Sequence, residues 1–190
     1  RTVKGEFENY QTPEGEVPAT QLDIPWETCY SLYGWGWRKG ATLKSSKKVL
    51  AVLIEVVAKG GNFLLGVGPK PDGTIEEQAV DRVTTIGKWL DKNGEAIYAT
   101  VNARKYNDGN VWFTQSKDGK KMYAMYALKE DDPEVPAVIE WTGNIPAGKK
   151  VTLLSTGKRV KCEVDGDRVK VYLPKHVDRT ESLAFSFGIK

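Results

Sequence analysis

The chain has 190 residues, of which 40% are hydrophobic and 28% charged, and its formal net charge is +3. These proportions are typical of globular proteins and exclude a disordered or collagen-like chain. The longest mainly apolar run, 49–58, contains Glu55 and is shorter than the ~20 residues of a transmembrane helix, so we expect no membrane span. The basic residues form short pairs among acids, which argues against a nucleic-acid partner.

Residues 1–44 are predicted to be loop-rich, because glycines and prolines interrupt the segment every few residues. Many acids and large aromatic side chains lie between these breakers. We expect a segment of this composition to pack on a core or to line a pocket, not to act as a linker.

A helix is predicted from Ser45 or Ser46 to about residue 59, because apolar residues recur there on one helical face. Gly60-Gly61-Asn62 provides the residues that commonly end a helix. The unbroken apolar run 63–67 that follows is typical of a strand buried on both faces, as in a parallel sheet.

A second helix is predicted over about 76–92, with Trp89 in the core and Asn93-Gly94 closing it. Helix, buried strand and helix form the end of an α/β unit. Such a unit holds too few strands for a complete barrel, which takes ~250 residues, so we expect the chain to be a fragment of a larger protein.

From residue 99 onward the pattern becomes all-β. Asp118-Gly119 and Asp165-Gly166 are typical hairpin turns, and the short strands around them predict an antiparallel β-sandwich. We place Trp112 and Trp141 in its core and a domain boundary between 1–102 and 103–190. The predicted strands are 111–114, 121–128, 137–141, 150–154, 161–164, 168–173 and 183–187.

No metal centre and no bound cofactor are predicted. The single histidine, His176, cannot build an HExxH zinc site, and we expect it at the surface. Cys29 and Cys162 could form one disulfide, but their spacing indicates neither a disulfide framework nor a metal clip.

Several strings in the first half resemble the C-terminal part of the family 29 glycoside hydrolases, the retaining α-L-fucosidases, in order and approximate spacing. They are Glu8–Glu14, Trp26–Cys29, Tyr33–Trp37, Lys59–Leu65, Val67–Pro69, Asp72–Gly73, Ile86–Leu90 and Asn93–Tyr98. The chain departs from the family at Gly66, where Asn is usual, and at Gly34, where Ser is common.

The resemblance implies an α/β plus all-β fold: the C-terminal part of a (β/α)8-like barrel, followed by an antiparallel β-sandwich. It implies a retaining exo-α-L-fucosidase that hydrolyses terminal α-L-fucosyl residues of an oligosaccharide or glycoconjugate without a cofactor. The remainder of the barrel would be a partner, since the family's nucleophilic Asp lies upstream of these residues. A secreted, periplasmic or lysosomal location is implied as well.

Retaining glycoside hydrolysis needs two carboxyl groups, one of which acts as acid and base. By resemblance Glu14 is the acid/base, and Glu27, in the apolar setting of Trp26 and Cys29, is its rival. Arg1 lies near the place of a substrate-contacting arginine of the family. A sugar face could stack on Trp35 and Trp37, since an indole offers a large apolar area and a polar N–H.

Two other interpretations remain open at this point. Residues 104–190 could be a non-catalytic carbohydrate-binding module, or the chain could be a structural domain without a ligand. The first of these needs a displayed platform of aromatic side chains, whereas the aromatic residues of the predicted strands alternate as core residues do.

Overall fold

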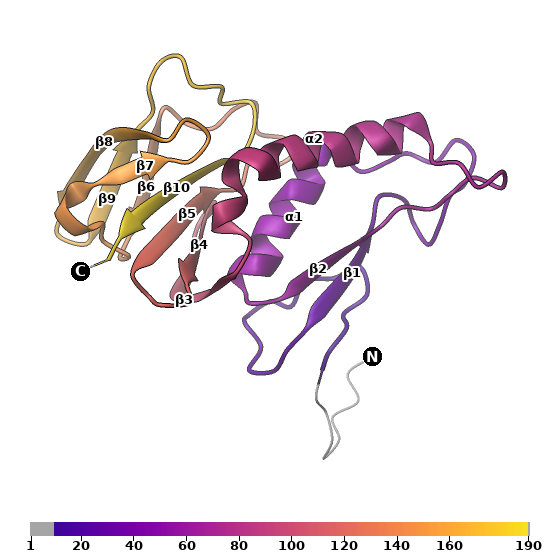
Figure 1. The fold of residues 1–190 in the computed structure, drawn as a ribbon, viewed down its shortest axis with the longest axis horizontal. Coiled ribbons are helices and arrows are strands. Elements are labelled where there is room, and N and C mark those ends of the chain that lie inside the picture. Colours follow the sequence, from indigo (N-terminus) through magenta and orange to yellow (C-terminus); the bar gives the residue numbers. More distant parts are fainter. Residues whose placement is uncertain (1–9, 190) are drawn as a thin grey trace.

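The computed structural model describes residues 10–189, which form two sheets with two helices between them (Figure 1). Among these residues, no helix is long and apolar enough to cross a membrane. The elements are β1 (Glu27–Ser31), α1 (Ser46–Ala58), β2 (Asn62–Gly66), α2 (Glu77–Asn93), η1 (Gly94–Ala96), β3 (Thr100–Asp108), β4 (Val111–Ser116), β5 (Lys121–Tyr126), β6 (Val138–Thr142), η2 (Ala147–Lys149), β7 (Val151–Leu153), β8 (Lys158–Asp165), β9 (Arg168–Tyr172) and β10 (Leu183–Gly188).

The small sheet consists of β1 and β2, which pair in parallel with α1 between them in the chain. The large sheet is antiparallel, in the order β3-β4-β5-β10-β7-β8-β9-β6. An α/β unit followed by an all-β antiparallel part is therefore confirmed. The expected sandwich differs in its connections: the strands form one continuous sheet, because β8 pairs with β7 along one part and with β9 along another.

Helix α1 begins and ends as its sequence predicts. The Ser45 side chain caps it by accepting a hydrogen bond from the Lys48 backbone N–H at 3.0 Å. At the other end Gly60 has φ +79°, and the Gly61 N–H donates to the Val56 carbonyl at 2.9 Å. This pattern is a Schellman motif, which satisfies the last carbonyls of the helix.

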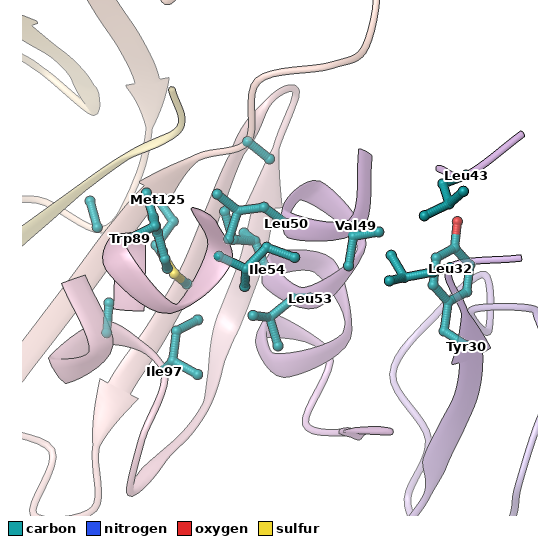
Figure 2. Packing of buried hydrophobic residues seen from close by; sticks show 14 of the residues in the cluster. Tyr30, Leu32, Leu43, Val49, Leu50, Leu53, Ile54, Trp89, Ile97 and Met125 are labelled. Carbon is teal, nitrogen blue, oxygen red and sulfur yellow. The ribbon is translucent and has the colours of Figure 1, made fainter. Parts of the chain in front are cut away.

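The same helix is buried on two sides. Figure 2 shows Val49 facing β1, while Leu50, Leu53 and Ile54 face the large sheet and α2. All of its residues except Lys48 are at least partly buried. A helix that is apolar nearly all round belongs in a protein interior, and α1 joins the two sheets through one shared core. The other members of this core include Tyr30, Leu32, Leu43, Trp89, Ile97 and Met125.

Gly61 is required by a close approach. A Cβ atom at this position would lie 2.4 Å from the ring of Trp26, which is buried and donates its indole N–H to the Lys59 carbonyl at 3.4 Å. The indole thus packs directly on the backbone after α1, and this contact fixes the start of β1 against the end of the helix.

Helix α2 is amphipathic, and Trp89 is buried as predicted, with its indole N–H donating to the Ser182 carbonyl at 2.7 Å. Trp141 is also buried. Trp112 is only half-buried and packs against the core shared with the helices. The exposed position of His176 is confirmed, and Cys29 and Cys162 are both free thiols.

Two local predictions are wrong. Strand β2 is not buried on both faces: Leu64 is 51% exposed, because within residues 10–189 only the face toward α1 is covered. Strand β1 forms inside the segment predicted to be loop-rich. Strand β3 begins at Thr100, close to the division between 1–102 and 103–190, which stays a prediction.

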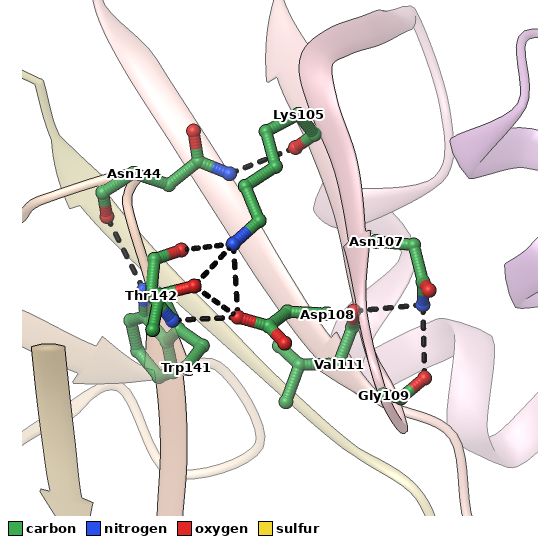
Figure 3. A network of polar contacts seen from close by, with 8 residues as sticks. All are labelled: Lys105, Asn107, Asp108, Gly109, Val111, Trp141, Thr142 and Asn144. Carbon is green, nitrogen blue, oxygen red and sulfur yellow. Dashed lines mark hydrogen bonds and ion pairs between the residues drawn. The ribbon is translucent and has the colours of Figure 1, made fainter. Parts of the chain in front are cut away.

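A polar cluster joins the two edge strands of the large sheet (Figure 3). Asp108 of β3 accepts hydrogen bonds from the backbone N–H of Thr142 on β6 at 2.6 Å and from its hydroxyl at 2.7 Å. Lys105 donates to Asp108 at 2.9 Å and to the Thr142 carbonyl at 2.7 Å. The edges therefore meet through side chains, which leaves fewer free backbone groups for pairing with another chain.

Burial acts to raise the pKa of Asp108, but the hydrogen bonds from Thr142 and Lys105 outweigh it, so that the pKa lies below its ordinary value. A depressed carboxyl pKa stabilises the fold above the ordinary pKa, and this contribution is lost as the pH falls through the folded-state value.

We predict that Asp108→Asn lowers the free energy of unfolding at pH 7 by about 1–2 kcal/mol, since it weakens charge-assisted hydrogen bonds of a partly exposed group. The difference from the parent chain should begin to shrink once the pH falls below the ordinary aspartate pKa, and it should disappear only after the pH has passed the lower folded-state pKa. Urea unfolding at pH 7 and over a series of acidic pH values measures this difference. Asp131→Asn, at an exposed position, is the control, and an equal loss in both variants would contradict the role of the cluster.

Candidate functional site

The candidate site lies where the two parallel strands end. Because the carboxyl ends of parallel strands meet at one edge, the loops after β1 and β2 lie together there, as ligand-binding loops of α/β sheets commonly do. They enclose an open hollow of about 250 Å³. Its lining includes Cys29, Ser31, Trp35, Leu64, Gly66 and Gly68.

A further segment runs parallel to the free edge of β1 and brings Glu14 to this face. The Cys29 N–H donates to the Pro13 carbonyl at 3.2 Å, and the Gly15 N–H donates to the Cys29 carbonyl at 2.8 Å. Glu14 is paired with Cys29. Since side chains alternate along a strand, Glu14, Cys29 and Glu27 share the face opposite α1.

The two acids differ in exposure and in position along the sheet. Glu14 is exposed, whereas Glu27 is half-buried. Glu27 is the first residue of β1, at the amino end of the strand, and Ser31 marks the carboxyl end where the hollow opens. Glu14 is level with Cys29, which lines the hollow.

Lys44 holds the base of the loop that follows β1. Its ammonium donates to the carbonyls of Ser31 at 2.6 Å and Tyr33 at 2.8 Å, and lies 4.8 Å from the centroid of the Tyr30 ring. Burial, and to a lesser degree the charge of Lys48, lowers the pKa of Lys44. One cation thus satisfies two carbonyls that would otherwise point into a largely apolar region.

Tyr33 ties the same loop to the start of α2. Its hydroxyl donates to a Glu76 carboxylate oxygen at 3.0 Å, and its backbone N–H donates to the Ser31 hydroxyl at 3.3 Å. Burial, followed by the hydrogen bond and charge of Glu76, raises the pKa of the Tyr33 phenol. The loop is therefore fixed at its base from two directions.

The two tryptophans of the loop have different surroundings. Trp35 is 87% exposed at the rim of the hollow, whereas Trp37 is half-buried and packs against the core. Within residues 10–189 the buried indole N–H of Trp37 has no hydrogen-bond partner. Gly68 lies against this loop so closely that a Cβ there would be 2.3 Å from the Trp37 backbone nitrogen.

Of the predicted site residues, Glu14 and Glu27 lie on one face of the small sheet, Trp35 lies at the rim of the hollow, and Trp37 packs against the core. Arg1 is outside the described residues. Sequence reasoning missed Cys29, Ser31 and Leu64 as lining residues. The alternation of residues along β1 and β2 could have identified them. It was not used, because β1 was predicted to be a loop and β2 to be buried on both faces. No group of three or more His, Cys, Asp or Glu in residues 10–189 could hold a metal ion.

A family model and curated relatives that match this chain are all alpha-L-fucosidases. The family model described as Alpha-L-fucosidase matches residues 1–95. Tissue alpha-L-fucosidase of Bos taurus is 33% identical over 95% of this chain, and its Homo sapiens counterpart is 31% identical over the same share. The chain spans 39% and 40% of these two relatives.

Solved structures agree in fold. Alpha-L-fucosidase isoenzyme 1 from Paenibacillus thiaminolyticus superposes with a TM-score of 0.82 at 26% identity, covering 96% of this chain and 45% of that one. A Thermotoga maritima alpha-fucosidase in complex with fucose has a TM-score of 0.74 at 26% identity, covering 94% of this chain and 42% of its own.

We predict that Gly68→Ala displaces the loop around Trp37 and lowers the free energy of unfolding by about 1–3 kcal/mol, because its Cβ meets backbone, which cannot move aside cheaply. Chemical unfolding measures the stability, and limited proteolysis at Arg38 and Lys39 measures loop exposure. Gly87→Ala in α2 is the steric control, since a Cβ there meets nothing within 4 Å, and it should raise the free energy of unfolding because alanine favours a helix over glycine. A Gly68→Ala chain as stable and as resistant as the parent would refute the close packing.

Proposed function

Since the chain belongs to the alpha-L-fucosidase family, we propose that it forms part of the sugar site of a retaining exo-α-L-fucosidase that removes terminal α-L-fucosyl residues from glycans. The observation that carries the proposal is the shared face of Glu14, Cys29 and Glu27 beside an open hollow rimmed by Trp35. This arrangement offers a carboxyl group and an aromatic surface at one edge of a parallel sheet.

We infer the architecture of the whole enzyme from the same elements. Residues 1–102 would be the end of a (β/α)8-like barrel, and residues 103–190 its C-terminal β-domain. The parallel pairing of the 11–14 segment, β1 and β2, with α1 on one side, supports the first part. The half-exposed Leu64 would then face the barrel interior, and the remaining strands would be the partner of this chain.

In the proposed mechanism Glu14 is the acid/base. Its protonated carboxyl donates a proton to the glycosidic oxygen as the bond to fucose breaks, and a nucleophilic carboxylate from outside these residues bonds to the anomeric carbon. Glu14, now a carboxylate, takes a proton from the water that hydrolyses this intermediate. An exposed position level with the hollow supports this role.

Glu27 is less suited to proton transfer, because it begins β1 at the amino end, whereas ligand sites of parallel sheets lie at the carboxyl ends. We assign it to sugar binding or to support of the barrel. Trp35 would stack on an apolar sugar face, with Trp37 positioned behind it. Arg1 remains a predicted substrate contact.

A carbohydrate-binding module in residues 104–190 is the weaker candidate. Its large aromatic side chains Phe113, Trp141, Phe185 and Phe187 are buried. The half-buried Trp112 is covered by Tyr106 on one side, with ring centroids 6.4 Å apart, and lies 5.5 Å from the Lys59 ammonium. No platform of exposed aromatic side chains is therefore displayed by the described part of this domain.

In a full-length enzyme that contains this chain, we predict that Glu14→Ala slows fucosides with poor leaving groups by ~10²–10⁴-fold, because those substrates need the proton. For an activated aryl fucoside, the rate of the first step, cleavage of the glycosidic bond, should fall less. Added azide, which needs no general base, should restore its turnover and give a fucosyl azide of retained anomeric configuration. Product analysis by NMR measures this outcome.

Glu27→Ala is the comparison within the same experiment. We expect a raised KM or lower stability without azide rescue. Rescue of Glu27→Ala and none of Glu14→Ala would reverse the two assignments.

We also predict that the 190-residue chain alone does not hydrolyse an aryl α-L-fucoside, because the covalent step of a retaining mechanism needs a nucleophile that we place outside it. A sensitive fluorogenic fucoside measures the rate against a no-enzyme blank. Turnover that survives rigorous purification and tracks the chain through chromatography would show that the nucleophile lies within these residues.

A further inference from the structure

A row of polar side chains crosses the large sheet on the face that packs against the helices. Ser186 of β10 is paired with Tyr123 of β5 on one side and with Thr152 of β7 on the other, and Thr152 is paired with Arg159 of β8. Paired residues of neighbouring strands project to the same face. The helix-side core includes Tyr123 and Ala184, so the row begins where the helices stop covering the sheet.

This row forms the floor of a groove of about 580 Å³ with a strongly positive lining. Lys120, Lys121, Lys150 and Arg159 line it, together with one acid, Asp118. Lys121 is paired with Glu95 at 2.6 Å, and Lys120 lies 3.9 Å from Asp118. Two of the four cations therefore already have acidic neighbours at the β4–β5 end.

The other end of the groove has unused binding groups. Lys150 and Arg159 form no ion pair and no side-chain hydrogen bond with the residues that the structure describes, and the hydroxyls of Thr152 and Ser186 are equally unpaired within 10–189. Two free cations beside two free hydroxyls are a set of donors with a net positive charge. An anion that accepts several hydrogen bonds is the ligand that such a set favours.

We propose that this groove binds the sulfate or carboxylate groups of an anionic saccharide and so holds charged glycans on the enzyme. The choice of a saccharide rests on the proposed function. The groove itself argues against a single-stranded nucleic acid as its occupant, because its aromatic residues Tyr123 and Phe187 are only 4% and 3% exposed. Single-stranded nucleic acids are usually bound by exposed aromatic side chains on which bases stack, and the groove offers none of these.

The test measures binding of the intact chain to dextran sulfate, hyaluronan and uncharged dextran by calorimetry at two salt concentrations. We expect one or both of the charged polymers to bind and uncharged dextran not to. The double variant Lys150→Gln, Arg159→Gln should bind at least ~10-fold more weakly and with a smaller salt dependence, since two charge contacts are lost. Preference for dextran sulfate assigns sulfate as the recognised group, and preference for hyaluronan assigns carboxylate.

The double variant Lys129→Gln, Lys175→Gln removes the same charge from exposed positions outside the groove and is the matched control. An equal loss in the control would overturn the proposal in favour of diffuse attraction. Equally tight binding of a single-stranded oligonucleotide through the groove would overturn the choice of a saccharide. This experiment measures binding, whereas the Glu14 experiment measures catalysis. Failure of the Glu14 experiment would therefore overturn the proposed hydrolysis without deciding whether the groove binds an anionic saccharide.

Discussion

The burial of α1 on two sides is the constraint on which the rest of the structure depends. Val49 packs toward β1, and Leu50 and Ile54 pack toward the large sheet, so one helix sets the distance between both sheets. Each buried aliphatic side chain contributes about 1.5–3 kcal/mol by its removal from water, and these contributions are shared by both parts of the chain. The α/β part and the β part are therefore energetically coupled, and a boundary drawn in the sequence does not mark a break in the core.

Close packing against glycine fixes the candidate site relative to that core. Gly61 lets the Trp26 indole lie on the backbone beyond α1, and Gly68 lets the loop of Trp37 lie on the segment after β2. At Gly61 the neighbour is an indole side chain at the amino end of the small sheet, and at Gly68 it is loop backbone at the carboxyl end. Gly68 lines the hollow, so the shape of the hollow depends on the absence of a Cβ atom there.

Much of the fold could be predicted from local pattern, and what could not depends on tertiary context. The helical spacing of apolar residues predicted α1 and α2, and Ser45 was predicted as a cap of α1. The Asp-Gly dipeptides predicted the hairpin turns, where Gly119 and Gly166 have positive φ. β1 was missed because five residues between breakers carry little signal until a neighbouring strand pairs with them. The exposure of Leu64 depends on what covers the sheet, which no pattern within β2 encodes. Glu14 was predicted as a site residue by resemblance, whereas its position beside Cys29 follows only from the pairing of the strands.

The Lys44 ammonium, bound to the carbonyls of Ser31 and Tyr33, has a consequence for how this site can diversify. It fixes the base of the loop while the tip with Trp35 stays exposed. Substitutions at the tip change the exposed surface around Trp35 without disturbing the core, whereas substitutions at the base alter the end of β1 and the contact with Glu76 together. Sequence change can therefore accumulate at the tip alone, and the anchored base preserves the fold through such changes.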